Sequence, residues 1–293
     1  MRDTRDTFRD KWEYNKGLAF EETLREDSEI FSWILGRNGF TTIREFSEYL
    51  KKKRRILDAG CGNGRVTALL RRYSPDATEI VGVDLVSSAI AQENLNAYHL
   101  SYQVSFVEKD LLSDLSDLGR FDFIYCQEVL HHLSTPEIAF QNLSSLLSKG
   151  GEIAIYVYRK KAPIREYVDD YVRSKISDLP YDEAIRICEQ ITELGKMLHQ
   201  CQLTIKVPRI DVLEIKEGEY DLQRFLYHFF MKCFWNPHLT FRENAAINYD
   251  WYHPQVATRH TLEEVRGWFL RAKLRVIHEN EDSYGITMRG KLM

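Results

Sequence analysis

The stretch Ile56–Arg65, ILDAGCGNGR, joins a short apolar run, an acid and alternating glycines in direct succession. Ile56 and Leu57 have the character of a buried strand, and Asp58 follows at its carboxyl end. The glycines allow a tight turn, and helical spacing of apolar residues starts at Val66. A strand, a glycine turn and a helix bring backbone N–H groups close to a ligand. This stretch therefore predicts a small-molecule site.

The glycine spacing separates two classes of ligand. A dinucleotide fingerprint starting at Gly60 would place its third glycine at position 65, where the chain has Arg65. The preceding acid also repels phosphate and attracts an amine. The pattern Asp-x-Gly-x-Gly-x-Gly resembles the S-adenosylmethionine loop of class I methyltransferases, whose cofactor carries an ammonium and a sulfonium. The resemblance assigns the methionine end and ribose to Asp58, Gly60, Cys61, Gly62 and Gly64, whereas a purely structural turn is the alternative.

Two further acids are expected at neighbouring strand ends. Predicted strands and helices alternate from 55 to 159, which is typical of a parallel sheet covered on both faces. Asp84 ends a strand 84 − 64 = 20 residues after the last loop glycine, where a carboxylate can bind ribose hydroxyls. Asp110 ends the next strand, predicted over 104–111. The resemblance implies that Asp84 binds ribose with Leu85 beside the adenine, and that Asp110 and the Leu111 N–H read the adenine edge.

The fourth strand and the segment leaving it occupy 121–133. A capping box from Ser134 to Glu137 is predicted to open a helix, and Lys149-Gly150-Gly151 is predicted to close it. Residues 152–158 are predicted to form the fifth strand. In the resembled family the tip of strand four lies under the transferable methyl group, which assigns Gln127 to the cofactor. Candidate general bases are His131 and His132 past this tip, and Tyr252 and His253 from the other side of the pocket. Structural roles are the alternative, and a carboxylate or free-amine acceptor needs no base.

The expected fold is α/β, with a doubly wound, mostly parallel seven-stranded sheet of the Rossmann-like methyltransferase type and a helical insertion after strand five. Residues 1–54 are predicted to form a helical lid, in which Trp12 and Tyr14 either cover the cofactor or pack the helices. The core comprises 55–159 and 250–293, ending in a capping box at Thr261 and an antiparallel strand pair. The insertion, 160–249, is expected to cap the acceptor side with helices at 163–171, 181–199 and 220–235. The last of these is aromatic nearly all round, which predicts burial.

Composition limits the choice of partners. The net charge of -4 and the pI near 6.2 give no overall attraction to nucleic acid or to an anionic membrane. The five cysteines contain no C-x-x-C pair, and no metal-ligand spacing appears. No apolar run is long enough to span a membrane. The stretch Met1-Arg2-Asp3 is charged, so no signal-peptide core is expected. A cytoplasmic protein with a small-molecule acceptor is expected.

The predicted function is transfer of a methyl group from S-adenosylmethionine to a small polar or anionic metabolite at oxygen, nitrogen or carbon, with S-adenosylhomocysteine as the product. An RNA or protein methyltransferase is the first alternative, in which the basic run 51–55 would bind the polymer. A cofactor-binding regulatory or assembly protein without transferase activity is the second. The identity of the acceptor and the formation of a homodimer stay open.

Overall fold

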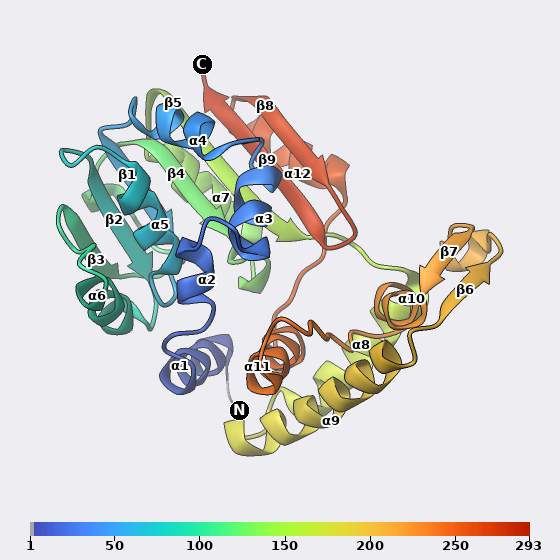
Figure 1. Cartoon of the computed structure of the whole chain (residues 1–293). Helices are drawn as coiled ribbons and strands as arrows, with labels where there is room; N and C mark the ends of the chain where they lie inside the picture. Colours follow the sequence, from blue (N-terminus) through green and yellow to red (C-terminus); the bar gives the residue numbers. More distant parts are fainter. Residues whose placement is uncertain (1–2) are drawn as a thin grey trace. The chain divides into compact units, whose positions relative to one another are not determined.

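The computed structural model describes residues 3–293, which divide into two compact units (Figure 1). Trp12–Arg159 and Thr258–Met293 form what we call the sheet unit. The chain up to Lys11 and Lys160–Ala257 form the insertion unit. Met1 and Arg2 of the charged N-terminal stretch lie outside the described residues.

These boundaries differ from the predicted ones. Residues 1–54 do not form one lid, because α2 (Phe20–Leu24), α3 (Glu29–Arg37) and α4 (Ile43–Leu50) share a buried core with strand β1 of the sheet unit. Helix α1 (Thr4–Tyr14) contributes residues to both units. The insertion unit also continues beyond residue 249, because α11 (Phe241–Tyr252) packs along a neighbouring insertion helix.

The sheet unit contains the predicted seven-stranded sheet, in the order β3-β2-β1-β4-β5-β9-β8 (Figure 1). The first five strands of the chain pair in parallel, and β9 joins β5 and β8 in antiparallel ladders. The chain reverses its winding direction between β1 and β4, which is where open α/β sheets bind ligands. The strands are β1 Arg55–Ala59, β2 Glu79–Asp84, β3 Val104–Glu108, β4 Phe121–Gln127, β5 Leu147–Tyr158, β8 Leu274–Glu281 and β9 Gly285–Leu292.

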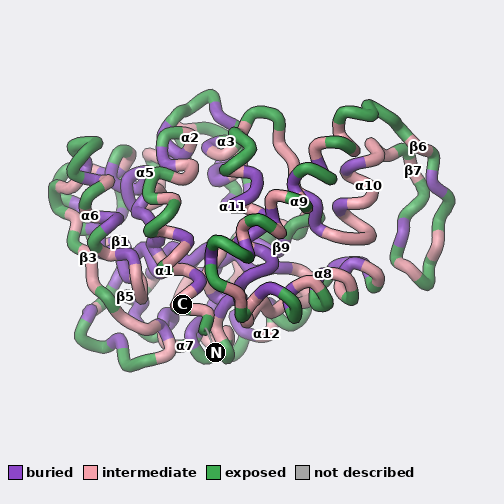
Figure 2. Tube along the Cα trace, turned by 90° about the horizontal axis from the view of Figure 1, so that it is seen from below, coloured by how far each residue is buried: buried purple, intermediate pink, exposed green. Residues whose placement is uncertain are grey.

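Both faces of the sheet are covered by helices. Along β1, Ile56 packs in one apolar core and Leu57 in the other, since successive side chains of a strand point to opposite faces. The Ile56 core includes α2 to α4, α5 (Arg65–Tyr73) and α6 (Ser88–Ala97). The Leu57 core includes α7 (Pro136–Ser145) and α12 (Leu262–Arg271). Buried residues accordingly follow the strands (Figure 2).

Two local predictions around α7 were wrong. The helix ends at Ser145, and Lys149-Gly150-Gly151 lies inside β5 rather than closing the helix. A side chain at position 151 would sit 2.9 Å from the carbonyl oxygen of Phe121, so glycine here permits close strand pairing at an irregular register. The N-cap is Thr135 without a side-chain hydrogen bond, and no Ser134 capping box forms. The capping box from Thr261 to Glu264 is confirmed.

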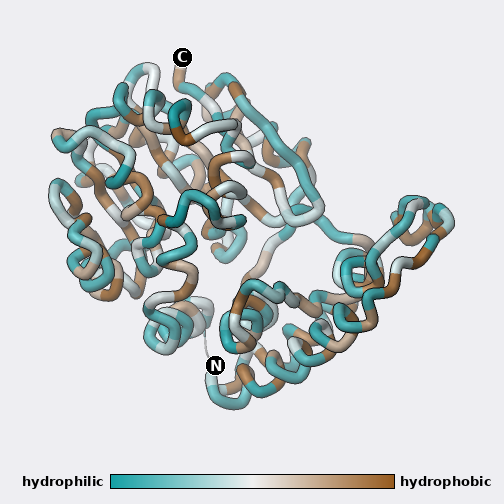
Figure 3. The backbone as a smooth tube through the Cα atoms, in the orientation of Figure 1, coloured by the Kyte–Doolittle hydropathy of each residue, from teal (hydrophilic) through white to brown (hydrophobic). Residues whose placement is uncertain are grey.

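Besides its part of α1, the insertion unit contains four α-helices, a short 3-10 turn and a hairpin among its described residues. Helices α8 (Pro163–Ile176) and α9 (Tyr181–Gln200) follow the prediction, and hydrophilic and hydrophobic residues are mixed along them (Figure 3). The sequence did not reveal the hairpin of β6 (Thr204–Val207) and β7 (Gly218–Asp221). The predicted aromatic helix is shorter, because α10 spans Leu222–Phe229. The rings of Tyr220 in β7 and of Phe225 and Phe229 in α10 pack on each other at partial exposure, so the predicted burial of this stretch was wrong.

Candidate functional site

The glycine loop connects β1 to α5 at the carboxyl edge of the sheet. Gly60, Gly62 and Gly64 have φ of 77°, 54° and 83°, in the left-handed region that favours glycine. A Cβ at Gly60 would lie 2.2 Å from a methyl carbon of Val129, and one at Gly62 would lie 2.6 Å from the Trp12 ring. The loop therefore needs glycine both for its backbone and for the side chains that lie directly on it.

The three predicted acids follow three adjacent strands. Asp58 is in β1, Asp84 ends β2, and Asp110 follows the end of β3 by two residues. Because these strands are parallel and neighbouring, the structure brings the acids to the same edge of the sheet. The predicted third strand was too long, since it ends at Glu108, but this leaves Asp110 in the connection that leaves the strand.

The acids differ in their environments. Asp58 is buried and accepts a hydrogen bond of 2.6 Å from the Thr67 hydroxyl. Burial, with a smaller contribution from Asp84, raises the pKa of Asp58 to about 7. One Asp84 oxygen accepts from the Gly62 N–H at 3.0 Å, which ties the end of β2 to the glycine loop. Asp110 accepts from the Leu112 N–H at 2.8 Å.

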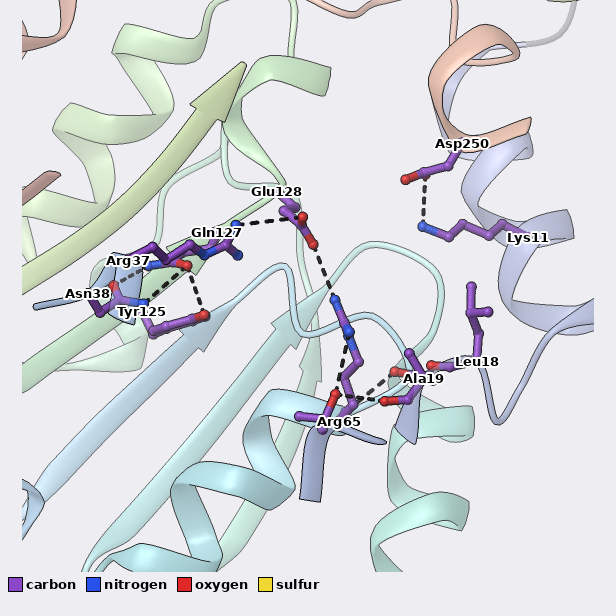
Figure 4. Close-up of polar contacts among 12 residues, drawn as sticks. Lys11, Leu18, Ala19, Arg37, Asn38, Arg65, Tyr125, Gln127, Glu128 and Asp250 are labelled. Atoms are coloured by element: carbon purple, nitrogen blue, oxygen red, sulfur yellow. Dashed lines mark hydrogen bonds and ion pairs between the residues drawn. The ribbon is translucent and has the colours of Figure 1, made fainter. Parts of the chain in front are cut away.

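Cys61, Leu85, Leu111 and Gln127 complete the predicted cofactor set. Burial raises the pKa of the Cys61 thiol well above its usual value, so this residue lines the loop as a neutral group. Leu85 is partly exposed beyond β2, whereas Leu111 is buried in the sheet core. Gln127 ends β4, and its side chain pairs with Asn38, which comes directly after α3 (Figure 4). All four lie on connections at the carboxyl edge or at a strand end there.

The sequence did not reveal a charged cluster at the tip of β4. The Arg37 guanidinium lies 3.3 Å from the Trp33 ring centroid and 4.3 Å from that of Tyr156. Its nearest carboxylate, Glu128, is 3.8 Å away and is 3.2 Å from the Arg65 guanidinium (Figure 4). We call Arg37, Arg65 and Glu128 the tip cluster. The net charge of the tip cluster is +1, from two guanidinium groups and one carboxylate.

Arg37 is the most unusual member of the tip cluster. Its side chain is 3% exposed, and its Nε and Nη1 atoms make no hydrogen bond within the described residues. Buried donors ordinarily have partners, so the Arg37 guanidinium retains unused capacity to bind an anion. The sequence contained one signal, since Arg65 stood where a dinucleotide loop has glycine, but nothing marked Arg37.

His131 and His132 lie where they were expected, just past the tip of β4. They form a short 3-10 turn, Leu130–His132, and both are buried. The His131 ring stacks on Tyr158 of β5 with centroids 3.5 Å apart. Its carbonyl oxygen accepts from the Thr258 N–H at 2.7 Å, which anchors the chain where it returns to the sheet unit. The His131 ring thus packs against the sheet, and a base role stays a prediction for both His131 and His132.

Tyr252 and His253 belong to the interior of the insertion unit. The Tyr252 hydroxyl lies 2.8 Å from an Asp169 oxygen, and burial raises its pKa well above the usual value. His253 lies 2.9 Å from both the Thr7 hydroxyl and the Leu179 carbonyl oxygen. Neither side chain has exposed surface. These contacts hold both side chains in hydrogen-bonded networks of the insertion unit, and a base role for either residue stays a prediction.

Neither a metal cluster nor a membrane-spanning helix is found among the described residues. Across 3–293, no cluster of three or more His, Cys, Asp or Glu residues has an arrangement suited to a metal ion. Over the same residues, no helix combines the length and apolar character required to cross a bilayer.

The strand order and the acid-flanked glycine loop define a class I S-adenosylmethionine-dependent methyltransferase fold. Residues 34–205 of the 293 also match the family model described as Methyltransferase domain. Because this match covers more than half of the chain, the protein belongs to that family, whose cofactor is S-adenosylmethionine.

Several curated proteins are similar over part of the chain. A match of 116 residues is 38% identical to an uncharacterized protein of Synechococcus sp., covering 38% of this chain and 28% of that protein. A second match, over 102 residues, is 29% identical to the ubiquinone biosynthesis O-methyltransferase of Coxiella burnetii and covers 35% of this chain and 42% of that protein. One of 149 residues is 28% identical to the sterol 24-C-methyltransferase of Kluyveromyces lactis, covering 50% and 39%. The matched region thus spans less than half of each relative.

Solved methyltransferases have similar structures at low sequence identity. Magnesium protoporphyrin IX methyltransferase from Synechocystis PCC 6803 matches with a TM-score of 0.49 and 13% identity, over 99% of this chain and 98% of that one. An O-methyltransferase family protein from Burkholderia thailandensis matches with a TM-score of 0.47 and 15% identity, over 96% and 68%. Both scores are below 0.5, so the fold assignment rests on the strand order of this chain.

Proposed function

We propose that this protein transfers a methyl group from S-adenosylmethionine to a small polar or anionic metabolite, at oxygen, nitrogen or carbon. The observation that carries the proposal is the meeting of Asp58, Asp84 and Asp110 beside the glycine loop, at the edge where the sheet reverses its winding. An amine, a ribose diol and an adenine each complement a carboxylate, and this cofactor contains all three.

The residues present fit the cofactor. Asp84 would accept the ribose hydroxyls, and Asp110 with the Leu111 N–H would bind the adenine edge. The ammonium would lie toward Asp58. The buried Arg37 guanidinium, with two nitrogens lacking hydrogen bonds, would take the methionine carboxylate. Val129 and Trp12 fill the space that side chains at Gly60 and Gly62 would need, so these two side chains would flank a ligand on the loop.

The chemistry places modest demands on the protein. When bound, the cofactor supplies an electrophilic methyl group on a sulfonium. The chain must align the acceptor, exclude water and, for a hydroxyl or ammonium acceptor, remove a proton. His132, buried just past the β4 tip, is our candidate for the proton acceptor. An unchanged turnover of His132→Ala on an identified acceptor would reject that role.

A small-molecule acceptor is favoured over a polymer. Relatives named for ubiquinone and sterol methylation support a small acceptor, and the net charge of -4 does not favour RNA. RNA or protein methylation is the alternative within enzymology, and an inactive cofactor-binding partner is the alternative outside it. A cytoplasmic location is part of the proposal and agrees with the five unpaired cysteines.

Two experiments test the function. Calorimetry with S-adenosylhomocysteine should detect binding to the wild type and at least about tenfold weaker binding to Asp84→Ala, since a carboxylate that accepts two hydroxyls is lost. No binding by the wild type would reject the cofactor site. A labelled-methyl screen over metabolite and RNA fractions then separates the acceptor classes. Labelling of RNA alone would overturn the small-molecule proposal, and labelling of no fraction would favour the inactive partner.

A further inference from the structure

Glu128 adopts a backbone conformation that its side chain disfavours. Its φ is 65°, in the left-handed region where residues with a Cβ are strained. The residue comes directly after β4, and its N–H lies 3.4 Å from the Tyr156 carbonyl oxygen of β5. A glycine would take up this turn without strain. The backbone alone therefore does not account for a glutamate at this position.

The turn at Glu128 directs the chain over the glycine loop. Val129 follows directly in the chain. Its two methyl carbons lie 2.2 and 2.6 Å from the position that a Cβ of Gly60 would occupy. The segment Gln127–Val129 therefore rests on the first glycine of the loop. Any shift of this segment would alter the space beside the part of the loop that faces the methionine end of the cofactor.

The Glu128 carboxylate fastens this segment to two other elements. One oxygen lies 3.2 Å from the Arg65 guanidinium, at the start of α5, and the other lies 3.8 Å from that of Arg37, at the end of α3 (Figure 4). Arg65 also reaches the Thr23 hydroxyl of α2 at 3.4 Å. One carboxylate thus joins β4, the helix after the loop and an N-terminal helix.

Stability alone does not account for this arrangement. The Glu128 side chain is 37% exposed and that of Arg65 is 21% exposed, and ion pairs near the surface contribute little to folding. The pair with the buried Arg37 is long, at 3.8 Å. The strained backbone works against folding as well. A role in ligand binding explains both features, because strained residues concentrate at sites where geometry must be held.

We propose that Glu128 is a positioning residue of the methyl-transfer site. Shared between Arg65 and Arg37, its carboxylate holds Gln127–Val129 on the glycine loop and keeps the Arg37 guanidinium aimed at the amino-acid end of the cofactor. Glu128 acts through these neighbours and does not itself take part in the displacement. The inference rests on the proposed cofactor site, and wild-type protein that fails to bind S-adenosylhomocysteine would reject that site rather than this role.

Two ligands separate positioning from a general structural effect. S-Adenosylhomocysteine carries the amino-acid end, whereas 5′-methylthioadenosine has the same adenosine and thioether without it. Glu128→Gln and Glu128→Gly should each weaken the binding of S-adenosylhomocysteine about tenfold, which is the size expected for one charge-assisted contact. The affinity for methylthioadenosine should change less than about twofold. Glu128→Gly should melt at or above the wild-type temperature, since its backbone is relaxed.

A matched control and a double variant complete the test. Lys273 is exposed and also has positive φ, at 57°, so Lys273→Gly should relieve strain without changing either affinity. Arg65→Met should resemble Glu128→Gln, and the double variant should lose no more than the larger single loss. Three outcomes would each overturn the proposal. They are an equal loss of affinity for both ligands, tighter S-adenosylhomocysteine binding in Glu128→Gln, and affinity losses that multiply in the double variant.

Discussion

The Thr67 hydroxyl donates a hydrogen bond of 2.6 Å to the buried carboxylate of Asp58. Asp58 lies in the strand before the glycine loop and Thr67 in the helix after it, so this bond closes the loop from behind. It also opposes the effect of burial, because a hydrogen bond to the carboxylate lowers the pKa that burial raises.

Asp58 should make stability fall as pH rises through the acid range. The pKa of Asp58 is about 7 in the folded protein and about 3.9 in an unfolded chain. Between these values the folded state keeps a proton that the unfolded state has lost. The free energy of unfolding should therefore decrease with pH, by at most about 1.4 kcal/mol per unit from this group.

Urea denaturation of wild type and Asp58→Asn from pH 4 to 8 measures this contribution. The difference between the two unfolding free energies should decline up to about pH 7 and then level off. In Thr67→Val, which lacks the donor, the decline should extend to higher pH. A difference that does not change between pH 4 and 7 would contradict the raised pKa.

Gly60→Ala should destabilise the sheet unit. Alanine would be strained at φ 77°, and its methyl group would overlap Val129, so we expect a loss of at least about 2 kcal/mol in the free energy of unfolding. Gly17→Ala is the control, because a Cβ there has no atom within 4 Å. Equal urea midpoints for the two variants would show that Val129 yields freely.

Trp12→Ala should weaken the binding of S-adenosylhomocysteine about tenfold. The Trp12 ring covers Gly62, and removal of the ring opens the loop to water. Tyr14→Ala on the same helix is the matched control, because Tyr14 is 49% exposed. Calorimetry compares the two. Unchanged affinity in Trp12→Ala would assign the ring to packing and remove the lid interpretation.

Tyr252→Phe should lower stability without affecting the cofactor. The lost hydroxyl leaves the buried Asp169 with one donor fewer, which costs about 1 to 3 kcal/mol of unfolding free energy. Tyr171→Phe, at an exposed tyrosine of the same unit, should cost almost nothing. Affinity for S-adenosylhomocysteine should stay at the wild-type value in both. A stable Tyr252→Phe protein with impaired turnover would support the catalytic interpretation of Tyr252.

Much of the sheet unit was predictable because its signals are local. A glycine at every second position after an acid, strands that end in acids, and a capping box are short patterns with a direct backbone cause. They predicted that Asp58, Asp84 and Asp110 lie at the carboxyl ends of strands in one parallel sheet. The errors at Lys149-Gly150-Gly151 and in the aromatic stretch 220–235 arose where tertiary pairing overrode local preference.

By itself, the sequence predicted the fold class, because periodicity and turn chemistry act over a few residues, and its resemblance to class I methyltransferases implied the cofactor. The tertiary structure decided the rest. Arg37, Arg65 and Glu128 come from three separate elements, and only the packing of α3 and α5 beside β4 places two guanidinium groups around one carboxylate. Within the insertion unit, packing around α11 buried Tyr252 and His253 in hydrogen-bonded networks, since burial and partner choice depend on residues far apart in the chain.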